Sequence, residues 1–144
     1  MTHLSFESID MLLQQMRSEV TRLGVRELRT PAEVDAVLGS EQEAVLVFVN
    51  STCGCAAGNA RPGLAIALQH PVRPKILTTV FAGQDREATA RAREIFGDVP
   101  PSSPSVALLK GGKLAYMMPR SQIEGTAAHE IAERLKMAFD AHCA

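Results

Sequence analysis

Short apolar runs alternate with helical apolar repeats along this chain, and together they predict an α/β protein. The run Ala44–Val49 is continuous and rich in β-branched side chains, which is typical of a central strand covered on both faces. Lys75–Phe81 and Ser105–Leu109 are predicted to be further strands. Gly111-Gly112 then predicts a hairpin turn into Lys113–Met118. The pattern therefore predicts four strands.

Apolar side chains at helical spacing predict helices between these strands and at both ends of the chain. We expect helices over about residues 7–23, 31–38, 56–69, 86–96 and 126–142. Thr30 is expected to cap the second helix with Glu33 completing a capping box, and Asp85 to cap the fourth. Pro62 falls inside the third helix and is expected to kink it.

The resulting order of elements is α-α-β-α-β-α-β-β-α. A βαβ unit implies that the first two strands are parallel, and the closing hairpin adds an antiparallel edge. This organisation predicts a thioredoxin-like fold, with a mixed four-stranded central sheet flanked by helices and an N-terminal helical extension. The 144 residues contain neither an internal repeat nor a domain-sized linker, so we expect residues 1–144 to form one domain.

Composition and charge exclude several classes of function. The chain is 46% hydrophobic and 22% charged, with a net charge of -1 and only 4% aromatic residues, so nucleic-acid binding is not expected. The N-terminus lacks the basic region and apolar core of a signal peptide, and the longest apolar run is too short to span a bilayer. We therefore predict a cytoplasmic protein with no membrane association.

The candidate chemistry lies in Cys53-Gly54-Cys55, between the most apolar strand and a predicted helix. Thiol–disulfide exchange needs one thiolate that attacks and a second thiol that resolves the mixed disulfide. Cys53 at a helix start has its thiolate stabilised by free N–H groups, and Cys55 is near enough to resolve. A disulfide across one glycine departs from relaxed geometry and should open easily. Thr52 and Gly54, which flank Cys53, are predicted to contact the substrate.

Two other uses of these cysteines remain open from the sequence. Both could be small buried hydrophobic residues, although a glycine between them packs poorly. Cys53 and Cys55 could instead bind zinc together with His142 and Cys143, or an iron–sulfur cluster together with Cys143. No second close pair of cysteines accompanies the first, so both metal sites would require the far end of the chain to fold back.

Two residues outside the cysteine pair are further candidates. Pro104 is either a rigid trans connector or a cis proline that faces the cysteines, in which case the Ser103 backbone would bind an extended substrate. Arg61 either lies solvated on a helix face or meets an anionic thiol cofactor. The strand Ala44–Val49 contains no acidic residue, so it offers no buried proton acceptor for the resolving thiol.

The chain from about Met16 to Cys143 resembles the bacilliredoxin family, small bacterial thioredoxin-like proteins with a Cys-Gly-Cys centre. The resemblance rests on these blocks: Met16–Glu19, Asn50–Pro62, Ala82–Asp85, Glu87–Ala90, Pro100–Ser105, Ile123–Gly125 and Phe139-Asp140 with Cys143. Members commonly carry histidine where this chain has Ser121.

This resemblance implies removal of bacillithiol, a low-molecular-weight thiol, from mixed disulfides of oxidised cytosolic proteins. Cys53 would attack the mixed disulfide and Cys55 would resolve or tune it. It implies no tightly bound cofactor, with bacillithiol as co-substrate, and equally allows a protein disulfide isomerase activity. Because Ser121 replaces a histidine that could assist thiol binding or proton transfer, the resemblance leaves the identity of the small thiol open.

Overall fold

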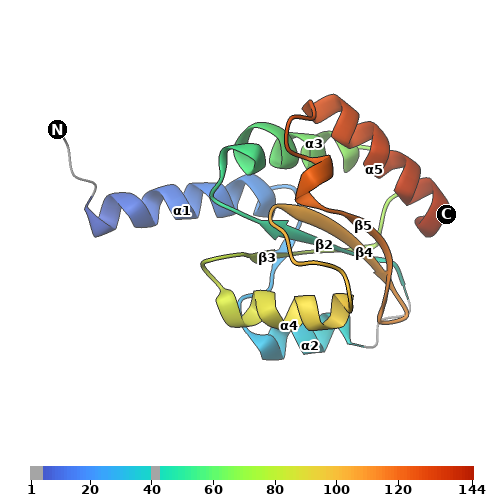
Figure 1. Ribbon diagram of the computed structural model, residues 1–144, viewed down its shortest axis with the longest axis horizontal. Helices are drawn as coiled ribbons and strands as arrows, with labels where there is room; N and C mark the ends of the chain where they lie inside the picture. Colours follow the sequence, from blue (N-terminus) through green and yellow to red (C-terminus); the bar gives the residue numbers. More distant parts are fainter. Residues whose placement is uncertain (1–4, 40–42) are drawn as a thin grey trace.

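The computed structural model describes residues 5–39 and 43–144 as a five-stranded sheet between two layers of helices (Figure 1). The strands are β1 (Arg26–Glu27), β2 (Val45–Asn50), β3 (Ile76–Phe81), β4 (Ser105–Lys110) and β5 (Lys113–Met118). They are arranged in the order β1-β3-β2-β4-β5. β3 pairs with β1 and β2 in parallel, whereas β4 is antiparallel to both β2 and β5. The predicted mixed sheet is confirmed, with β1 as an additional, very short edge strand.

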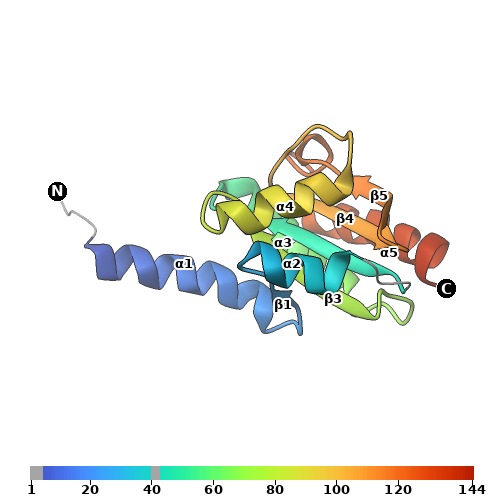
Figure 2. The same ribbon diagram turned by 90° about the horizontal axis from the view of Figure 1, so that it is seen from below.

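Helices cover both faces of the sheet (Figures 1 and 2). The helices are α1 (Phe6–Thr21), α2 (Pro31–Leu38), α3 (Arg61–Ala67), α4 (Arg86–Phe96) and α5 (Ala128–Cys143). α3 and α5 pack on each other on one face, and α2 and α4 pack on each other on the opposite face. None of the helices within residues 5–39 and 43–144 has the length and hydropathy needed to cross a membrane.

The central strand β2 contributes to the core on both sides of the sheet. Leu46 and Phe48 pack with the α3–α5 layer, whereas Val45, Val47 and Val49 pack with the α2–α4 layer. All six residues of β2 are buried, as expected for a continuous apolar strand with both faces covered. The cysteine pair follows the C-terminal end of this buried strand.

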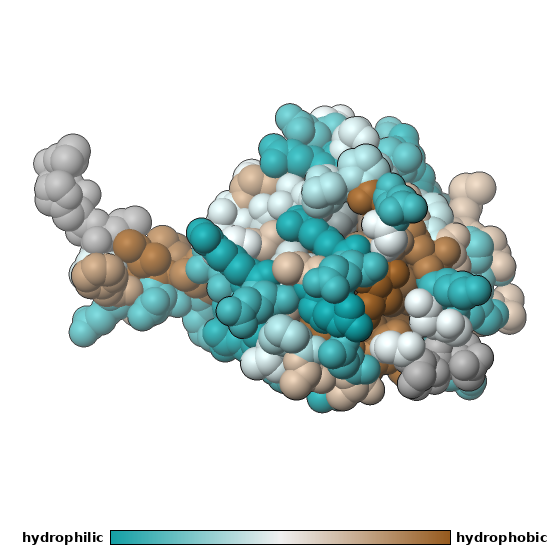
Figure 3. All heavy atoms as spheres, turned by 60° about the horizontal axis from the view of Figure 1, so that its bottom comes forward, coloured by the Kyte–Doolittle hydropathy of each residue, from teal (hydrophilic) through white to brown (hydrophobic). Residues whose placement is uncertain are grey.

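Only the second half of α1 packs against the body of the protein. Val20 is fully buried in the core, but Ile9, Met11 and Leu12 are exposed and Phe6 is 88% exposed. The first half of the helix projects from the body (Figures 1 and 2), and its apolar side chains are visible in Figure 3. The amphipathic helix predicted for residues 7–23 is confirmed, but its apolar stripe is buried only near its C-terminal end.

The helix after the cysteines differs in form from the single helix, kinked at Pro62, that was predicted to run to Gln69. It begins at Gly54, widens into the π-helical segment η1 (Ala56–Ala60) and continues as α3. The Arg61 N–H bonds to the Ala56 carbonyl, five residues back. Pro62 has no N–H, and its ring would crowd the carbonyl four residues before it, so a wider turn accommodates it. The predicted distortion is therefore a π-helical turn that precedes Pro62.

The two predicted helix caps have different outcomes. Thr30 accepts a hydrogen bond from the Glu33 N–H, and the Glu33 carboxylate in turn accepts one from the Arg29 N–H. Asp85 does occupy the residue before α4, but its side chain makes no capping bond. Its carboxylate instead pairs with the guanidinium of Arg17 from α1, at 2.7 Å. The prediction that the Asp85 side chain caps α4 was wrong because a tertiary ion pair takes its oxygens.

Candidate active site

Three chain segments meet at one end of the sheet because of the strand pairing. Val49 pairs with Ser105, so the segment after β2, which contains the cysteines, lies beside the segment before β4. Met118 pairs with Val106, so the residues after β5 reach the same end. Residues 51–55, the loop at Pro104 and the segment from Pro119 are thereby gathered at this edge. We refer to the segment Ser102–Pro104 as the proline loop.

The two cysteines of the pair are free thiols in direct contact. Their sulfur atoms lie 2.7 Å apart, and both side chains are half-buried. A disulfide bond requires about 2.05 Å, so the sulfurs need only a small approach to bond. Cys55 packs in part against the core between the sheet and the α3–α5 layer, but neither thiol is fully buried. The alternative in which both cysteines are buried packing residues is therefore wrong. Thr52 and Gly54 are both exposed beside Cys53.

The surroundings shift the pKa values of the two thiols in opposite directions. Burial alone would raise the pKa of Cys53. The pKa is nevertheless lowered below its ordinary value by hydrogen bonds that Cys53 accepts from the Cys55 thiol, the Ser51 hydroxyl and the backbone N–H groups of Ala56 and Cys55. Burial and the hydrogen bond and charge of Cys53 raise the pKa of Cys55, which the charge of Arg120 opposes. Cys53 is therefore the thiol that ionises first, as an attacking thiol requires.

A buried arginine supports the loop that precedes Cys53. Arg61 is only 4% exposed and forms an ion pair with Glu19 of α1. Its Nη1 donates to the Asn50 side-chain oxygen (2.9 Å) and to the Ser51 carbonyl (3.0 Å). Ser51 Oγ in turn accepts a hydrogen bond from the Cys53 N–H. Arg61 is thus neither solvated nor directed at a thiol cofactor, and both predicted alternatives for it were wrong.

The proline loop contains the cis peptide bond between Ser103 and Pro104, as the cis alternative predicted. Pro104 is buried, and Ser103 is half-buried with its carbonyl accepting a hydrogen bond from Arg120 Nη1 at 3.4 Å. Among the described residues, the Ser103 N–H has no hydrogen-bond partner. This amide therefore has a free donor, and substrate binding by Thr52, Gly54, Ser103 and Pro104 stays a prediction.

Arg120 is the residue at this site that the sequence analysis missed. Its charge acts on both Cys55 and Cys53, and its guanidinium bonds to the proline loop. The sequence does contain a signal for it, because Arg120 lies two residues past the predicted strand ending at Met118. In the predicted hairpin, that position is near the segment before β4. Ser121, next to it, is exposed.

The fourth predicted metal ligand lies at the other end of the molecule. Cys143 lines a cavity of about 280 Å3 with Ala44, Lys110 and His142. Ala44 precedes β2 and Cys53 follows it, so the two ends are separated by about 20 Å, the length of a six-residue strand. The sites combining Cys53 and Cys55 with His142 or Cys143 are therefore excluded by geometry. No cluster of three potential metal ligands occurs within residues 5–39 and 43–144.

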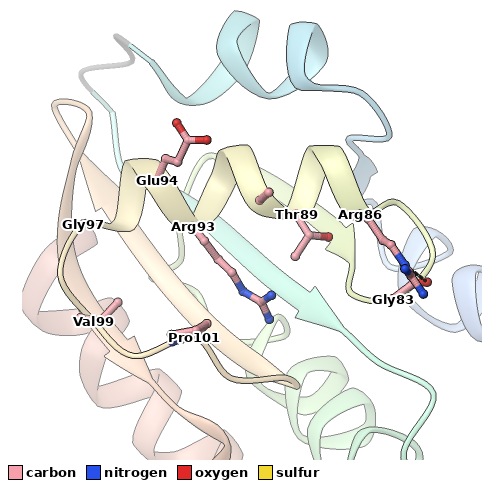
Figure 4. A pocket seen from close by; sticks show the side chains of 9 residues that line it. Gly83, Arg86, Thr89, Arg93, Glu94, Gly97, Val99 and Pro101 are labelled. Atoms are coloured by element: carbon pink, nitrogen blue, oxygen red, sulfur yellow. Dashed lines mark hydrogen bonds between the residues drawn. The ribbon is translucent and has the colours of Figure 1, made fainter.

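A separate cavity of about 480 Å3 lies between α4 and the segment leading to the proline loop. Arg93 extends from α4 toward the segment that carries Val99 and Pro101 (Figure 4). Its Nη2 donates to the Ser102 carbonyl at 3.4 Å. Neither cysteine of the pair lines this cavity.

Comparison with solved structures identifies the class to which this architecture belongs. The structure of thioredoxin from Malassezia sympodialis superposes with a TM-score of 0.59 and 19% sequence identity. The match covers 83% of this chain and 91% of the thioredoxin chain. Thioredoxin F from spinach chloroplast superposes with a TM-score of 0.57 and 15% sequence identity, and the match covers 91% of this chain and 94% of the thioredoxin F chain. The chain therefore has a thioredoxin-like fold.

Sequence comparison assigns the family. Residues 9–143 match the family model described as disulphide isomerase. A bacilliredoxin of Halalkalibacterium halodurans is 48% identical over 92% of this chain and 92% of its own length. One from Symbiobacterium thermophilum is 53% identical over 89% of this chain and 91% of its own. The chain belongs to the bacilliredoxin family and is an enzyme of thiol–disulfide exchange.

Proposed function

We propose that this enzyme removes bacillithiol from mixed disulfides of oxidised proteins. The observation that carries the proposal is the contact between two free thiols whose pKa values are shifted in opposite directions, lower for Cys53 and higher for Cys55. Such a pair separates the attacking thiolate from a thiol that stays protonated until it is needed. The naming of its relatives as bacilliredoxins supports bacillithiol as the small thiol.

The reaction takes place in two exchange steps. The Cys53 thiolate attacks the bacillithiol sulfur of the mixed disulfide, forms a Cys53–bacillithiol disulfide and releases the substrate protein as a thiolate. The Cys55 thiolate then attacks the Cys53 sulfur, displaces bacillithiol as a thiolate and leaves a Cys53–Cys55 disulfide. The Cys53–Cys55 disulfide is the two-electron oxidised form of the enzyme, and another thiol must reduce this disulfide before the next cycle. Such a cycle suits a reducing compartment, so we place it in the cytoplasm.

The substrate protein is expected to lie as an extended strand against the proline loop. The Ser103 N–H offers a hydrogen bond to its backbone, and the exposed Thr52 and Gly54 flank the attacking thiol. Backbone pairing of this kind depends little on side chains. The proposed enzyme would therefore accept many oxidised proteins.

Intact-mass spectrometry tests the proposal with a carrier protein whose single cysteine holds bacillithiol. The Cys55→Ser variant should accumulate one bacillithiol on Cys53, and the carrier should regain a free thiol in equal amount. Cys143→Ser is the matched control and should transfer as the wild type does, because Cys143 lies at the opposite end of β2. Transfer to Cys53→Ser at the wild-type rate would disprove the assigned role of Cys53.

Isomerisation of protein disulfides is a second candidate, favoured by the description of the matching family model. An isomerase uses the same attack by Cys53 but needs no small thiol. Reactivation of scrambled ribonuclease, measured beside bacillithiol release under the same conditions, separates the two activities. Efficient reactivation without bacillithiol transfer would establish the isomerase and reject the first proposal.

A further inference from the structure

Arg120 is held beside the reactive thiols by three hydrogen bonds. It begins the short helix η2 (Arg120–Gln122) directly after Pro119. Its backbone N–H donates to Ser102 Oγ (3.2 Å), and its Nη1 donates to the Ser103 carbonyl (3.4 Å). Its Nε donates to the Glu124 carboxylate (3.0 Å). The guanidinium is thereby fixed between the proline loop and the start of the segment that leads to α5.

Part of this guanidinium remains available to a ligand. The Arg120 side chain is 43% exposed, and among the described residues its Nη2 donates no hydrogen bond. Its charge acts on the sulfurs of both Cys53 and Cys55. A small molecule joined to Cys53 through a disulfide extends only a few atoms beyond that sulfur. The guanidinium is bonded to the proline loop, and the strand pairing places that loop at the same end of the sheet as Cys53.

We propose that Arg120 determines the specificity for the small thiol by binding a carboxylate of that thiol while it is disulfide-linked to Cys53. The inference rests on the proposed mixed-disulfide exchange and adds to it a residue that recognises an acidic group of the small thiol. A planar guanidinium presents paired N–H donors that match the two oxygens of a carboxylate, and bonds between charged partners are the stronger ones.

The charges around Arg120 are consistent with this role. Glu124 neutralises part of the guanidinium but engages only Nε. The neighbouring cation Arg134 donates to the Gln122 carbonyl and adds positive charge to the same surface. Arg120 takes no part in the transfer of electrons or protons. The bonds that form and break are those of the exchange already described, and Arg120 orients the leaving or incoming thiol.

The test uses two small thiols that differ only in charge. A carrier protein with one cysteine is converted to its mixed disulfide with 3-mercaptopropionate or with 3-mercaptopropionamide. Transfer of each small thiol to the full-length enzyme is followed in single turnover by acid quench and intact-mass spectrometry. Wild type should react about tenfold faster with the acid than with the amide, as expected for one charge-assisted hydrogen bond at a part-exposed site.

The variant Arg120→Gln should reduce the acid-to-amide rate ratio to within about twofold of one, because the charge-dependent contact with the carboxylate is lost. The rate with the amide should fall by a smaller factor than the rate with the acid, because the charge of Arg120 also acts on Cys53 and Cys55. Glu124→Gln and Arg134→Gln are matched controls, because each alters the charge on the same surface but keeps the guanidinium of Arg120. Both should retain the preference for the acid.

Three results would overturn the inference. An unchanged preference in Arg120→Gln, or an equal loss of both rates, would show that Arg120 does not select the thiol. A loss of preference in Arg134→Gln equal to that in Arg120→Gln would point to the general charge of the surface. If instead wild type transfers neither small thiol to Cys53, the proposed exchange itself fails, which is a separate and recognisable outcome.

Discussion

Replacement of Arg61 by methionine tests whether a buried cation holds the loop that positions Cys53. Methionine keeps much of the volume of the side chain but removes its charge and its donors. The substitution would break the ion pair with Glu19 and the hydrogen bonds to Asn50 Oδ1 and the Ser51 carbonyl. Ser51 would then be free to shift relative to Cys53.

The expected loss of stability follows from the groups left behind. Asn50 Oδ1 keeps a partner because it also accepts the Ser51 N–H, but the buried Ser51 carbonyl loses the hydrogen bond from Arg61. Removing one member of a buried ion pair costs about 3–5 kcal/mol. Glu19 is 33% exposed and can regain water, so we expect the lower end, about 3 kcal/mol. The pKa of Cys53 should also rise as the Ser51 hydroxyl moves away.

Urea denaturation measures the change in the free energy of unfolding, and the pH dependence of iodoacetamide labelling reports the pKa of Cys53. Arg22→Met is the matched control, because Arg22 is an exposed arginine that lines the same small cavity as Arg61 and Glu19. It should change stability by less than about 0.5 kcal/mol. A loss below about 1 kcal/mol in Arg61→Met, with an unaltered labelling profile, would refute the reasoning.

Two further substitutions test the thiol and the packing beneath it. Ser51→Ala removes a hydroxyl that lowers the pKa of Cys53, so the midpoint of alkylation against pH should move upward and labelling at neutral pH should slow; an unchanged midpoint contradicts this. Gly63→Ala would place a Cβ 2.7 Å from Ile131 Cγ2. It should cost about 1–3 kcal/mol of stability in urea denaturation despite the better helix propensity of alanine. Gly58→Ala, which meets nothing within 4 Å, is its control.

Much of the fold follows from local pattern. The continuous run that became β2 could only be buried on both faces, and the Gly111-Gly112 pair predicted the hairpin that brings β5 beside β4. β1 could not be predicted, because its two residues are too few to show a period. The π-helical turn η1 was missed as well, since only the general distortion expected near Pro62 is visible in the sequence.

The site was predictable where it depends on neighbours in the chain, and not where it depends on tertiary pairing. Cys53 and Cys55 are adjacent because one glycine separates them. The burial of Arg61 depends on Glu19 from α1, and no local pattern connects these two residues. The position of Arg120 likewise depends on the strand register that brings the end of β5 beside the proline loop.

The strand β2 offers no acid to accept a proton from the resolving thiol, and the contact between the sulfurs explains how the pair can work without one. While Cys53 is a thiolate, three effects raise the pKa of Cys55: its burial, its hydrogen bond to Cys53 and the negative charge of Cys53. Once Cys53 enters a mixed disulfide, that negative charge is gone, whereas Arg120 still lowers the pKa of Cys55. The pKa of Cys55 must therefore fall at the moment when its thiolate is required. In the proposed reaction, attack by Cys53 would in this way activate Cys55, and the order of the two steps would follow from the charge of Cys53.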